Sequence, residues 1–335
     1  MNLAADAALI ALDWGTSSLR AYRLDAGGGV LDTRTLPWGI MRLPPPDPAS
    51  GATSADARFE LAFEAACGDW LRRQPGLPVI ASGMVGSAQG WREAAYLDVP
   101  AELADIGRTL TRVERGAGAP LHIVPGLIER GPLPNVMRGE ETQIAGIVAG
   151  LPAGQSPDLL VCLPGTHSKW VRVQGQRIVH FDTFMTGEVY AALRDHTILG
   201  RTMREGAGFD AAAFAHGAAV AGTPQGRAGV LSTIFSSRTL GLAGRMEASA
   251  QADYLSGLLI GHEVASVLAL QAGEDGQTRH ATDRKPTLVL CGQPELCERY
   301  EQVLRHYGAG PAVHAPQATE RGLWLMARAA GLLIR

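Results

Sequence analysis

The stretch Ala8-Leu-Ile-Ala-Leu-Asp-Trp-Gly-Thr-Ser-Ser-Leu-Arg-Ala-Tyr22 decides the fold. Its first five residues form an apolar run that predicts a buried strand, and this run ends in the carboxylate of Asp13. A small, hydroxyl-rich turn at 15–18 follows, and a second predicted strand covers 19–24. The stretch therefore predicts a β-hairpin in which strand, rather than helix, follows the polar turn.

The turn itself suggests a phosphate-binding loop. Gly15 allows close approach of the backbone, and the N–H groups and hydroxyls of Gly15, Thr16 and Ser17 can donate to phosphate oxygens. Asp13 can hold a hydrated divalent cation beside those phosphates. The simpler alternative is a tight hairpin whose turn residues are polar, because Gly, Ser and Asp favour turns anyway.

Composition limits the class of protein. A chain of 335 residues suggests two domains, and 46% hydrophobic with 19% charged residues is typical of a globular protein. The net charge of −3, without a basic block, argues against a nucleic-acid partner. Residues 1–12 lack the features of a signal peptide, and we find no apolar run of about 18 residues, which argues against a membrane span.

Four cysteines, without a C-x-x-C pair, favour buried thiols in a reducing cytoplasm. They are Cys67, Cys162, Cys291 and Cys297.

A triglycine at 27–29 turns the second strand into a third, residues 30–36. The same pattern returns about 150 residues later, after a linker-like segment at 150–157. There a strand at 158–163, a polar turn at 164–169 and strands at 170–173 and 178–181 are predicted. Such internal duplication predicts two domains of one architecture. Taken alone, the second turn could also be an ordinary hairpin.

Two further loops follow predicted strands, where open α/β sheets place their ligands. One is Ser82-Gly83-Met84, after a short strand at 77–81. The other is Gly292-Gln293, which follows a strand at 287–291 and opens a helix that runs to His306, so that it suits an anion or adenosine.

A helix is predicted to begin near Gly139, with Glu140 and Glu141 in its first turn. Acidic residues at a helix start are favoured by the helix dipole, which is one explanation. The other is a general base at the mouth of a binding site.

The remaining predicted elements are helices. They cover 54–73, 189–195 with Thr186 as cap, 230–240, 248–272 and 319–333. Within 248–272, His262 and Glu263 are interpreted as core and rim residues rather than as ligands.

Several strings resemble one family, the 2-dehydro-3-deoxygalactonokinases of the actin/hexokinase/Hsp70 superfamily. The Asp13-Trp-Gly-Thr-Ser turn is shared by the whole superfamily, whereas Pro164-Gly-Thr-His-Ser-Lys-Trp170 and Phe184-Met-Thr-Gly-Glu188 are specific to this family. The other matching strings are Ser82-Gly-Met-Val-Gly86, Arg138-Gly-Glu-Glu-Thr-Gln143 and Leu290-Cys-Gly-Gln-Pro294.

The resemblance implies a two-domain, actin-like (ribonuclease H-like) α/β fold with a nucleotide cleft between the domains. It places the first domain at 1–150, completed by a C-terminal helix at 318–335, and the second at 151–317. It also implies phosphorylation of the 6-hydroxyl of 2-dehydro-3-deoxy-D-galactonate by ATP with Mg²⁺, in galactonate catabolism in the cytoplasm. ATP and the sugar acid are the expected partners, and a homodimer is a further possibility.

Roles can be carried over to matching positions as expectations of this resemblance. Asp13 would hold Mg²⁺ through water, and Glu141 or else Glu140 would accept the hydroxyl proton, with Asp182 as a third candidate for that role. The nucleotide would be bound by Gly15, Thr16, Ser17, Gly165, Thr166, His167, Lys169, Gly292 and Gln293. The sugar acid would be bound by Arg42, Ser82, Gly83, Met84, Arg138 and Asp182.

Three alternatives share this fold. The chain could be a kinase for another sugar acid, such as the gluconate epimer, or a phosphohydrolase of the exopolyphosphatase type that uses water as nucleophile. It could also be an ATP-gated switch or filament, as in the actin branch.

Overall fold

The computed structural model describes residues 6–46, 54–115, 118–151, 158–272 and 285–333. The chain forms two compact units. Unit 1 takes its residues from 1–157, 172–181 and 315–335, and unit 2 from 158–171 and 182–314. The predicted domain boundaries at 150 and 318 stay predictions.

Unit 1 is built on a six-stranded sheet in the order β3-β2-β1-β4-β8-β7. Its strands are β1 (Ala7–Trp14), β2 (Leu19–Asp25), β3 (Val30–Leu36), β4 (Val79–Ser82), β7 (Thr111–Val113) and β8 (Leu121–Ile123). Strands β1, β2 and β3 pair antiparallel, whereas β4 lies parallel to β1 and β8 parallel to β4. The hairpins predicted from the first 36 residues are confirmed.

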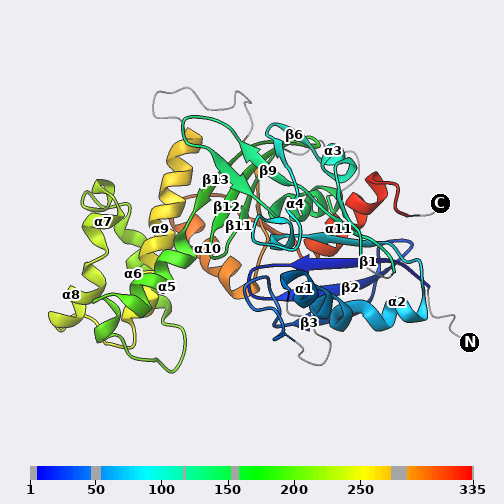
Figure 1. The fold of residues 1–335 in the computed structure, drawn as a ribbon. Helices are drawn as coiled ribbons and strands as arrows, with labels where there is room; N and C mark the ends of the chain where they lie inside the picture. Colours follow the sequence, from blue (N-terminus) through cyan, green and yellow to red (C-terminus); the bar gives the residue numbers. More distant parts are fainter. Residues whose placement is uncertain (1–5, 47–53, 116–117, 152–157, 273–284, 334–335) are drawn as a thin grey trace, which may run out of the picture. The chain divides into compact units, whose positions relative to one another are not determined.

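Unit 1 also contains helices (Figure 1). They are α1 (Ala55–Phe63), a π-helix (Glu64–Gly68), α2 (Asp69–Arg73), α3 (Leu103–Arg108), α4 (Glu140–Ala149) and α11 (Ala318–Ala329). Leu12 and Trp14 of β1 pack with Phe59 and Phe63 of α1 in one core cluster. Helix α11 contacts β1 and packs along α4. The apolar run of β1 is buried because it lies at the centre of this sheet.

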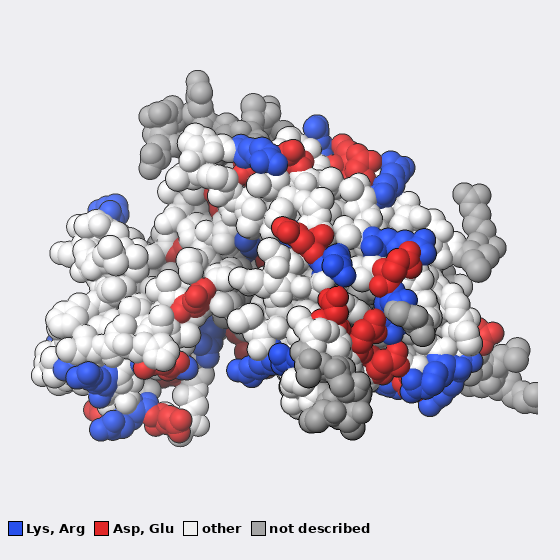
Figure 2. All heavy atoms as spheres, in the orientation of Figure 1, with Lys and Arg blue, Asp and Glu red and all other residues white. Residues whose placement is uncertain are grey.

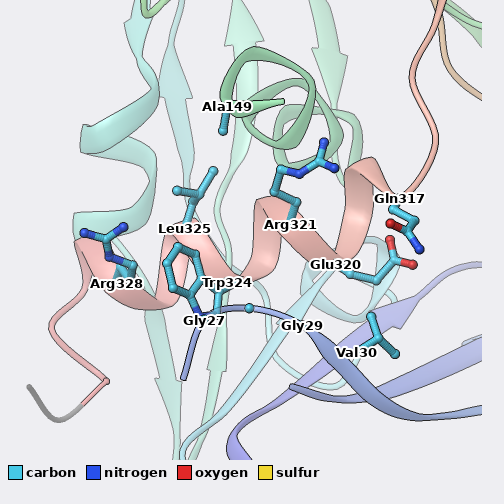
Figure 3. A pocket seen from close by; sticks show the side chains of 11 residues that line it. Gly27, Gly29, Val30, Ala149, Gln317, Glu320, Arg321, Trp324, Leu325 and Arg328 are labelled. Atoms are coloured by element: carbon cyan, nitrogen blue, oxygen red, sulfur yellow. The ribbon is translucent and has the colours of Figure 1, made fainter. Parts of the chain in front are cut away.

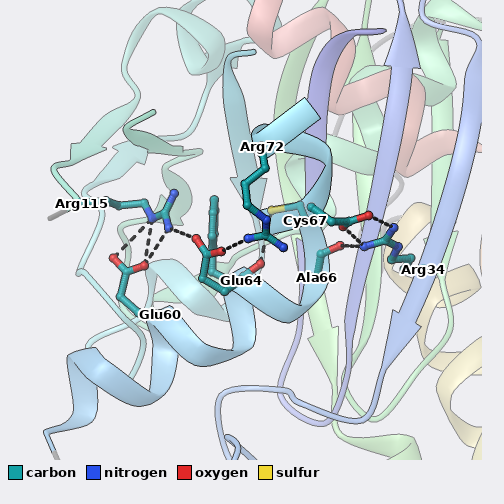
Figure 4. Close-up of polar contacts among 9 residues, drawn as sticks. Arg34, Glu60, Glu64, Ala66, Cys67, Arg72 and Arg115 are labelled. Atoms are coloured by element: carbon teal, nitrogen blue, oxygen red, sulfur yellow. Dashed lines mark hydrogen bonds and ion pairs between the residues drawn. The ribbon is translucent and has the colours of Figure 1, made fainter. Parts of the chain in front are cut away.

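The π-helix lies in a network of ion pairs (Figure 4). The guanidinium of Arg115 is 2.9 Å from Glu60 and 2.8 Å from Glu64, and it lies 3.6 Å from the centre of the Phe63 ring. Arg72 also pairs with Glu64, at 3.0 Å. Because the Arg115 side chain is only 3% exposed, these contacts position the helix more firmly than a surface pair would.

Two glycines set the distance between α4 and α11. A Cβ on Gly146 would lie 1.8 Å from the carbonyl oxygen of Ala318, and one on Gly322 would lie 1.9 Å from that of Thr142. Both obstacles are backbone atoms, which a rotamer change cannot move away. The two helices can therefore pack this closely only with glycine at these positions.

We predict that Gly322→Ala destabilises the protein by at least ~1–3 kcal/mol, the usual cost of forcing an extra methyl into a packed core. Urea unfolding measures this loss. The matched control is Gly131→Ala, because a Cβ at Gly131 meets nothing within 4 Å. Equal stability of the two variants would show that α4 and α11 do not pack as described.

A small three-stranded sheet in unit 1 lies before α4. It contains β5 (Tyr96–Asp98), β9 (Gly126–Glu129) and β10 (Asn135–Met137) in the order β10-β9-β5. A 3-10 turn, Met84–Gly86, follows β4. These short elements were not predicted, because three or four residues carry too little periodicity.

The sheet of unit 2 repeats the strand order of unit 1. Its strands are β11 (Asp158–Leu163), β12 (Ser168–Gln174), β13 (Arg177–Phe184), β14 (Thr287–Leu290) and β15 (Val313–His314), in the order β15-β14-β11-β12-β13. The far ends of β12 and β13 are counted with unit 1, where Arg177 pairs with Glu102 of β6 (Ala101–Glu102). In both sheets the fourth, first, second and third strands are neighbours in that order, and a further parallel strand, β8 in unit 1 and β15 in unit 2, pairs with the fourth. Unit 1 adds β7 beyond β8, and the shared order confirms the predicted duplication.

Unit 2 is otherwise helical. Its α-helices are α5 (Thr186–His196), α6 (Ala211–Val220), α7 (Val230–Thr233), α8 (Ser236–Leu242), α9 (Gln251–Ala272) and α10 (Pro294–His306). Its 3-10 turns are Gly200–Thr202 and Gly226–Ala228.

Two predictions in this region were wrong. The helix expected over 230–240 is broken between α7 and α8, where the hydroxyls of Ser236 and Ser237 donate to backbone carbonyls three residues earlier. Thr186 does not cap α5, whose N-cap is Met185, because the Thr186 hydroxyl donates to Glu263 instead.

Helix α9 is long and apolar enough to cross a membrane by length and composition. Its apolar side chains, however, lie in the cores of unit 2: Tyr254, Leu255 and Leu258 in one cluster, Ile260, Val264 and Val267 in another. This burial is typical of a core helix.

On the face drawn in Figure 2, acidic and basic side chains are interspersed. This distribution agrees with the small net charge of the chain. The prediction that nucleic acid is not a partner rests on the sequence alone.

Candidate functional site

The carboxyl ends of β1 and β4 meet in unit 1. Asp13 pairs with Ser82 in the parallel register of the two strands. Gly83 then turns away with φ +94°, and a Cβ there would lie 2.9 Å from the carbonyl oxygen of Trp14. The polar turn after β1 and the glycine loop after β4 are therefore neighbours, as expected for a ligand site at this edge of the sheet.

The turn after β1 is held by its own backbone and by the loop that follows β3. The N–H of Gly15 donates to the carbonyl of Ser18 at 3.0 Å, and Ile40 and Met41 donate to the carbonyls of Gly15 and Thr16. Thr16 and Ser17 are exposed, and so is Arg42 on the supporting loop. The turn is thus fixed in shape and open to a ligand.

Helix α4 begins beside the same loop. Gly139, at φ +108°, precedes it, and a Cβ there would lie 3.2 Å from the Cα of Gly83. Glu141 is fully buried; its carboxylate accepts hydrogen bonds from the Gly139 N–H at 2.7 Å and from the Thr142 hydroxyl at 3.0 Å. Glu140 is half-buried and accepts from the N–H of Arg138 at 3.0 Å.

Burial raises the pKa of Glu141 to about 8, and the neighbouring Glu140 adds to the rise. A carboxyl group with such a pKa can exchange a proton near neutral pH, which is a property of general bases.

The same shift makes stability depend on pH. A raised pKa in the folded protein means that folding favours the protonated form of Glu141. The stability of the protein is therefore highest, as far as this group is concerned, below pH ~4.5, and it falls as the pH rises through ~8. We predict that Glu141→Gln, which has no charge to bury, gains a few kcal/mol relative to the parent between pH 5 and pH 9. Thermal unfolding across this range measures it; a pH-independent difference would contradict the shift.

Arg138 is a buried guanidinium with unused donors. Its Nη2 donates to the carbonyl of Ala94 at 2.8 Å, and the group lies 4.3 Å from the centre of the Tyr96 ring. Its Nε and Nη1 are buried without a hydrogen-bond partner among the described residues, and so is the hydroxyl of Ser82. Orphaned buried donors are costly unless a ligand satisfies them.

Asp13 is the acidic side chain at the end of β1. Its side chain is 25% exposed and lies 3.4 Å from Arg20; burial raises its pKa, which Arg20 opposes. Among the described residues, we find no cluster of three or more His, Cys, Asp or Glu that could hold a metal. One carboxylate of this kind fits Mg²⁺ that is held mainly by phosphate oxygens and water.

In unit 2, the turn after β11 is packed against the start of α5. The N–H of Glu188 donates to the carbonyl of Thr166 at 3.0 Å, and a Cβ on Gly187 would lie 2.4 Å from the carbonyl oxygen of Gly165. His167 contacts the carboxylate of Glu188. Gly187 is therefore required for this close approach.

Lys169 and Asp182 lie on neighbouring strands of unit 2. Lys169 is buried, and its Nζ donates to the hydroxyl of Thr183 at 2.7 Å, whereas Asp182 is half-buried. The loop after β14 lies near the turn as well, because a Cβ on Gly292 would be 3.4 Å from the carbonyl oxygen of Pro164. Gln293 is exposed and is the N-cap of α10.

A cavity of about 640 Å³ in unit 1 contains none of the predicted site residues. It lies between the triglycine turn at 27–29 and α11, from which Trp324 and Arg328 project (Figure 3). The Trp324 ring packs on Gly28, where a Cβ would lie 3.0 Å from it. The candidate site is at the strand ends, not in this cavity.

Sequence reasoning missed the contacts of two residues, one in each unit. Tyr96, which stacks on Arg138, belongs to a three-residue strand that has no sequence signal. Glu263, interpreted as a core or rim residue, is buried and accepts hydrogen bonds from Trp170 and Thr186 of the two family-specific strings.

Two sheets that share the order fourth, first, second, third, each with a small polar turn after its first strand, match the actin-like class of ATPases and sugar kinases that the resemblance implies. The model of the 2-keto-3-deoxy-galactonokinase family matches residues 13–326. The chain therefore belongs to this family.

Relatives and a solved structure agree with that assignment. A Rhizobium meliloti (strain 1021) protein named "Probable 2-dehydro-3-deoxygalactonokinase DgoK1" is 37% identical over 95% of this chain and 96% of its own length. The 2-dehydro-3-deoxygalactonokinase of Escherichia coli (strain K12) is 34% identical over 96% and 97%. A crystal structure from Sinorhizobium meliloti, assigned to the same activity, is 36% identical over 96% and 98% of the two chains, with a TM-score of 0.79.

Proposed function

We propose that this protein transfers the γ-phosphoryl group of ATP to the 6-hydroxyl of 2-dehydro-3-deoxy-D-galactonate, in galactonate catabolism in the cytoplasm. Family membership supports the reaction class. The observation that carries the substrate class is buried Arg138, whose unpartnered Nε and Nη1 suit the carboxylate of a sugar acid. A neutral sugar would offer these donors only uncharged acceptors, whose hydrogen bonds to a guanidinium are weaker than those of a carboxylate.

In the proposed reaction, the 6-hydroxyl oxygen bonds to the γ-phosphorus while the bond to the bridging oxygen of ADP breaks. Glu141 accepts the hydroxyl proton, with Glu140 as the alternative base. Its hydrogen bonds to the Gly139 N–H and the Thr142 hydroxyl fix the carboxylate, so that the proton is transferred at a defined atom.

The nucleotide half of the proposal concerns the two turns. Gly15, Thr16 and Ser17 of unit 1 and Gly165, Thr166 and His167 of unit 2 would donate to phosphate oxygens, with positive charge from Lys169. Gly292 and Gln293 would bind adenosine. Mg²⁺, held by Asp13 through water, would neutralise charge that develops on the phosphates.

The remaining proposed contacts belong to the sugar acid. Ser82, with its orphaned hydroxyl, and the backbone of Gly83 and Met84 would bind it beside Arg138. Arg42 and Asp182 stay candidates for its other oxygens.

A coupled ADP-release assay with Mg-ATP tests the proposal. The galacto and gluco epimers of 2-dehydro-3-deoxyhexonate are offered separately, with a no-acceptor control. We expect turnover with the galacto acid. Preference for the gluco acid would make the protein a kinase for that epimer, and ADP release without acceptor would make it a phosphohydrolase.

A further inference from the structure

We propose that Glu263 is a positioning residue that fixes the nucleotide-binding turn of unit 2. The inference rests on the proposed function, because it takes the turn at 165–167 to bind phosphates. Glu263 lies on α9 and is 3% exposed. It carries no proposed contact to substrate.

Its carboxylate joins four elements. Oε1 accepts a hydrogen bond from the Trp170 indole of β12 at 2.7 Å. Oε2 accepts from the Thr186 hydroxyl at the start of α5, and from the Tyr300 hydroxyl of α10 at 2.8 Å. Tyr300 in turn is 2.8 Å from the hydroxyl of Ser168 on β12.

These partners flank the turn on both sides. Ser168 and Trp170 are two residues apart on β12 and so point to the same side, toward Glu263, immediately after the turn. Thr186 precedes Gly187 and Glu188, whose backbones pack on Gly165 and Thr166. One buried carboxylate thus fixes the strand that leaves the turn and the helix start that supports it.

A carboxylate suits this position better than an amide. Trp170, Thr186 and Tyr300 each direct a donor at it, and an ionised carboxylate is an acceptor at both oxygens. Glutamine would direct its NH₂ group, which can only donate, at one set of these donors, so that their hydrogen bonds would be lost. Burial raises the pKa of Glu263, and the hydrogen bonds oppose that rise.

A buried carboxylate could also serve stability alone, so the experiment must separate the two roles. The test variant is Glu263→Gln, and the matched control is Asp253→Asn. Asp253 lies on the same helix and accepts from the backbone N–H of Asp210 at 2.8 Å, away from the turn. Both variants remove one negative charge and disturb one set of hydrogen bonds on α9.

Mg-ADP affinity is measured by calorimetry well below the melting temperature of each variant, together with the KM for ATP and for the sugar acid. We expect Glu263→Gln to weaken Mg-ADP binding and raise the KM for ATP by about tenfold, the cost of roughly one lost hydrogen bond to a charge. The KM for the sugar acid should stay within about twofold, because its proposed contacts lie mainly in unit 1. Asp253→Asn should leave all three constants within about twofold.

If the Glu263→Gln variant binds Mg-ADP with the same affinity as the parent protein, the inference is overturned. If that variant fails to fold, Thr186→Val, which removes a single hydroxyl, replaces it with the same expected direction. A parent protein that binds Mg-ADP but phosphorylates no sugar acid would refute the proposed function and leave the affinity comparison intact. A parent that does not bind Mg-ADP would refute both.

Discussion

Replacing Glu141 by glutamine is expected to lower kcat by about 10²–10⁴-fold, the usual contribution of a general base. Glutamine preserves the volume of this fully buried side chain and can still accept from the Gly139 N–H, but it cannot take a proton. The KM values should change little. Steady-state kinetics with the accepted sugar acid measures the effect.

The pH profile adds a second readout. Because burial raises the pKa of Glu141 to about 8, kcat/KM of the parent should reach half of its maximum near pH 8 and level off above that pH. Glu140→Gln is the matched control, since Glu140 is adjacent but less buried. If Glu140→Gln loses the rate and Glu141→Gln retains it, the base is Glu140.

Replacing Arg138 by methionine is expected to raise the KM for the sugar acid by about 10²–10³-fold, since two charged hydrogen bonds to its carboxylate are lost. Methionine keeps much of the apolar packing on Tyr96 but has no donors. The KM for ATP should stay within a few-fold. This is because Arg138 is proposed to contact the sugar acid and not ATP.

An exposed arginine nearby provides the control for this variant. Arg130 pairs with Asp98 at the surface of the small sheet, so Arg130→Met should leave both KM values unchanged. An Arg138→Met enzyme with an ordinary KM for the sugar acid would show that the acid's carboxylate binds elsewhere. Arg42 would then be the next candidate.

Much of the fold could be predicted from the sequence because its elements carry strong local signals. The run at 8–12, the triglycine at 27–29 and their repeat at 158–181 predicted both hairpins and the duplicated strand order. Glu140 and Glu141 were correctly predicted in the first turn of a helix beginning near Gly139. Each of these features depends on neighbours in the sequence.

The remaining features depend on contacts between distant residues. The environments of the two glutamates differ in burial and in hydrogen-bond partners, which no local pattern reports. The orphaned donors of Arg138 arise from its packing against Ala94 and Tyr96, some 40 residues earlier. Glu263 looked like an ordinary core residue because Trp170, Thr186 and Tyr300 approach it from three other elements.

The most direct test of the central claim is the structure of the product. After incubation with Mg-ATP and 2-dehydro-3-deoxy-D-galactonate, a two-dimensional ³¹P–¹H NMR spectrum shows which carbon carries the phosphate. We predict a phosphate monoester coupled to the two protons on C6, formed in equal amount to ADP. Inorganic phosphate in place of the ester, or coupling to another carbon, would contradict the proposed function.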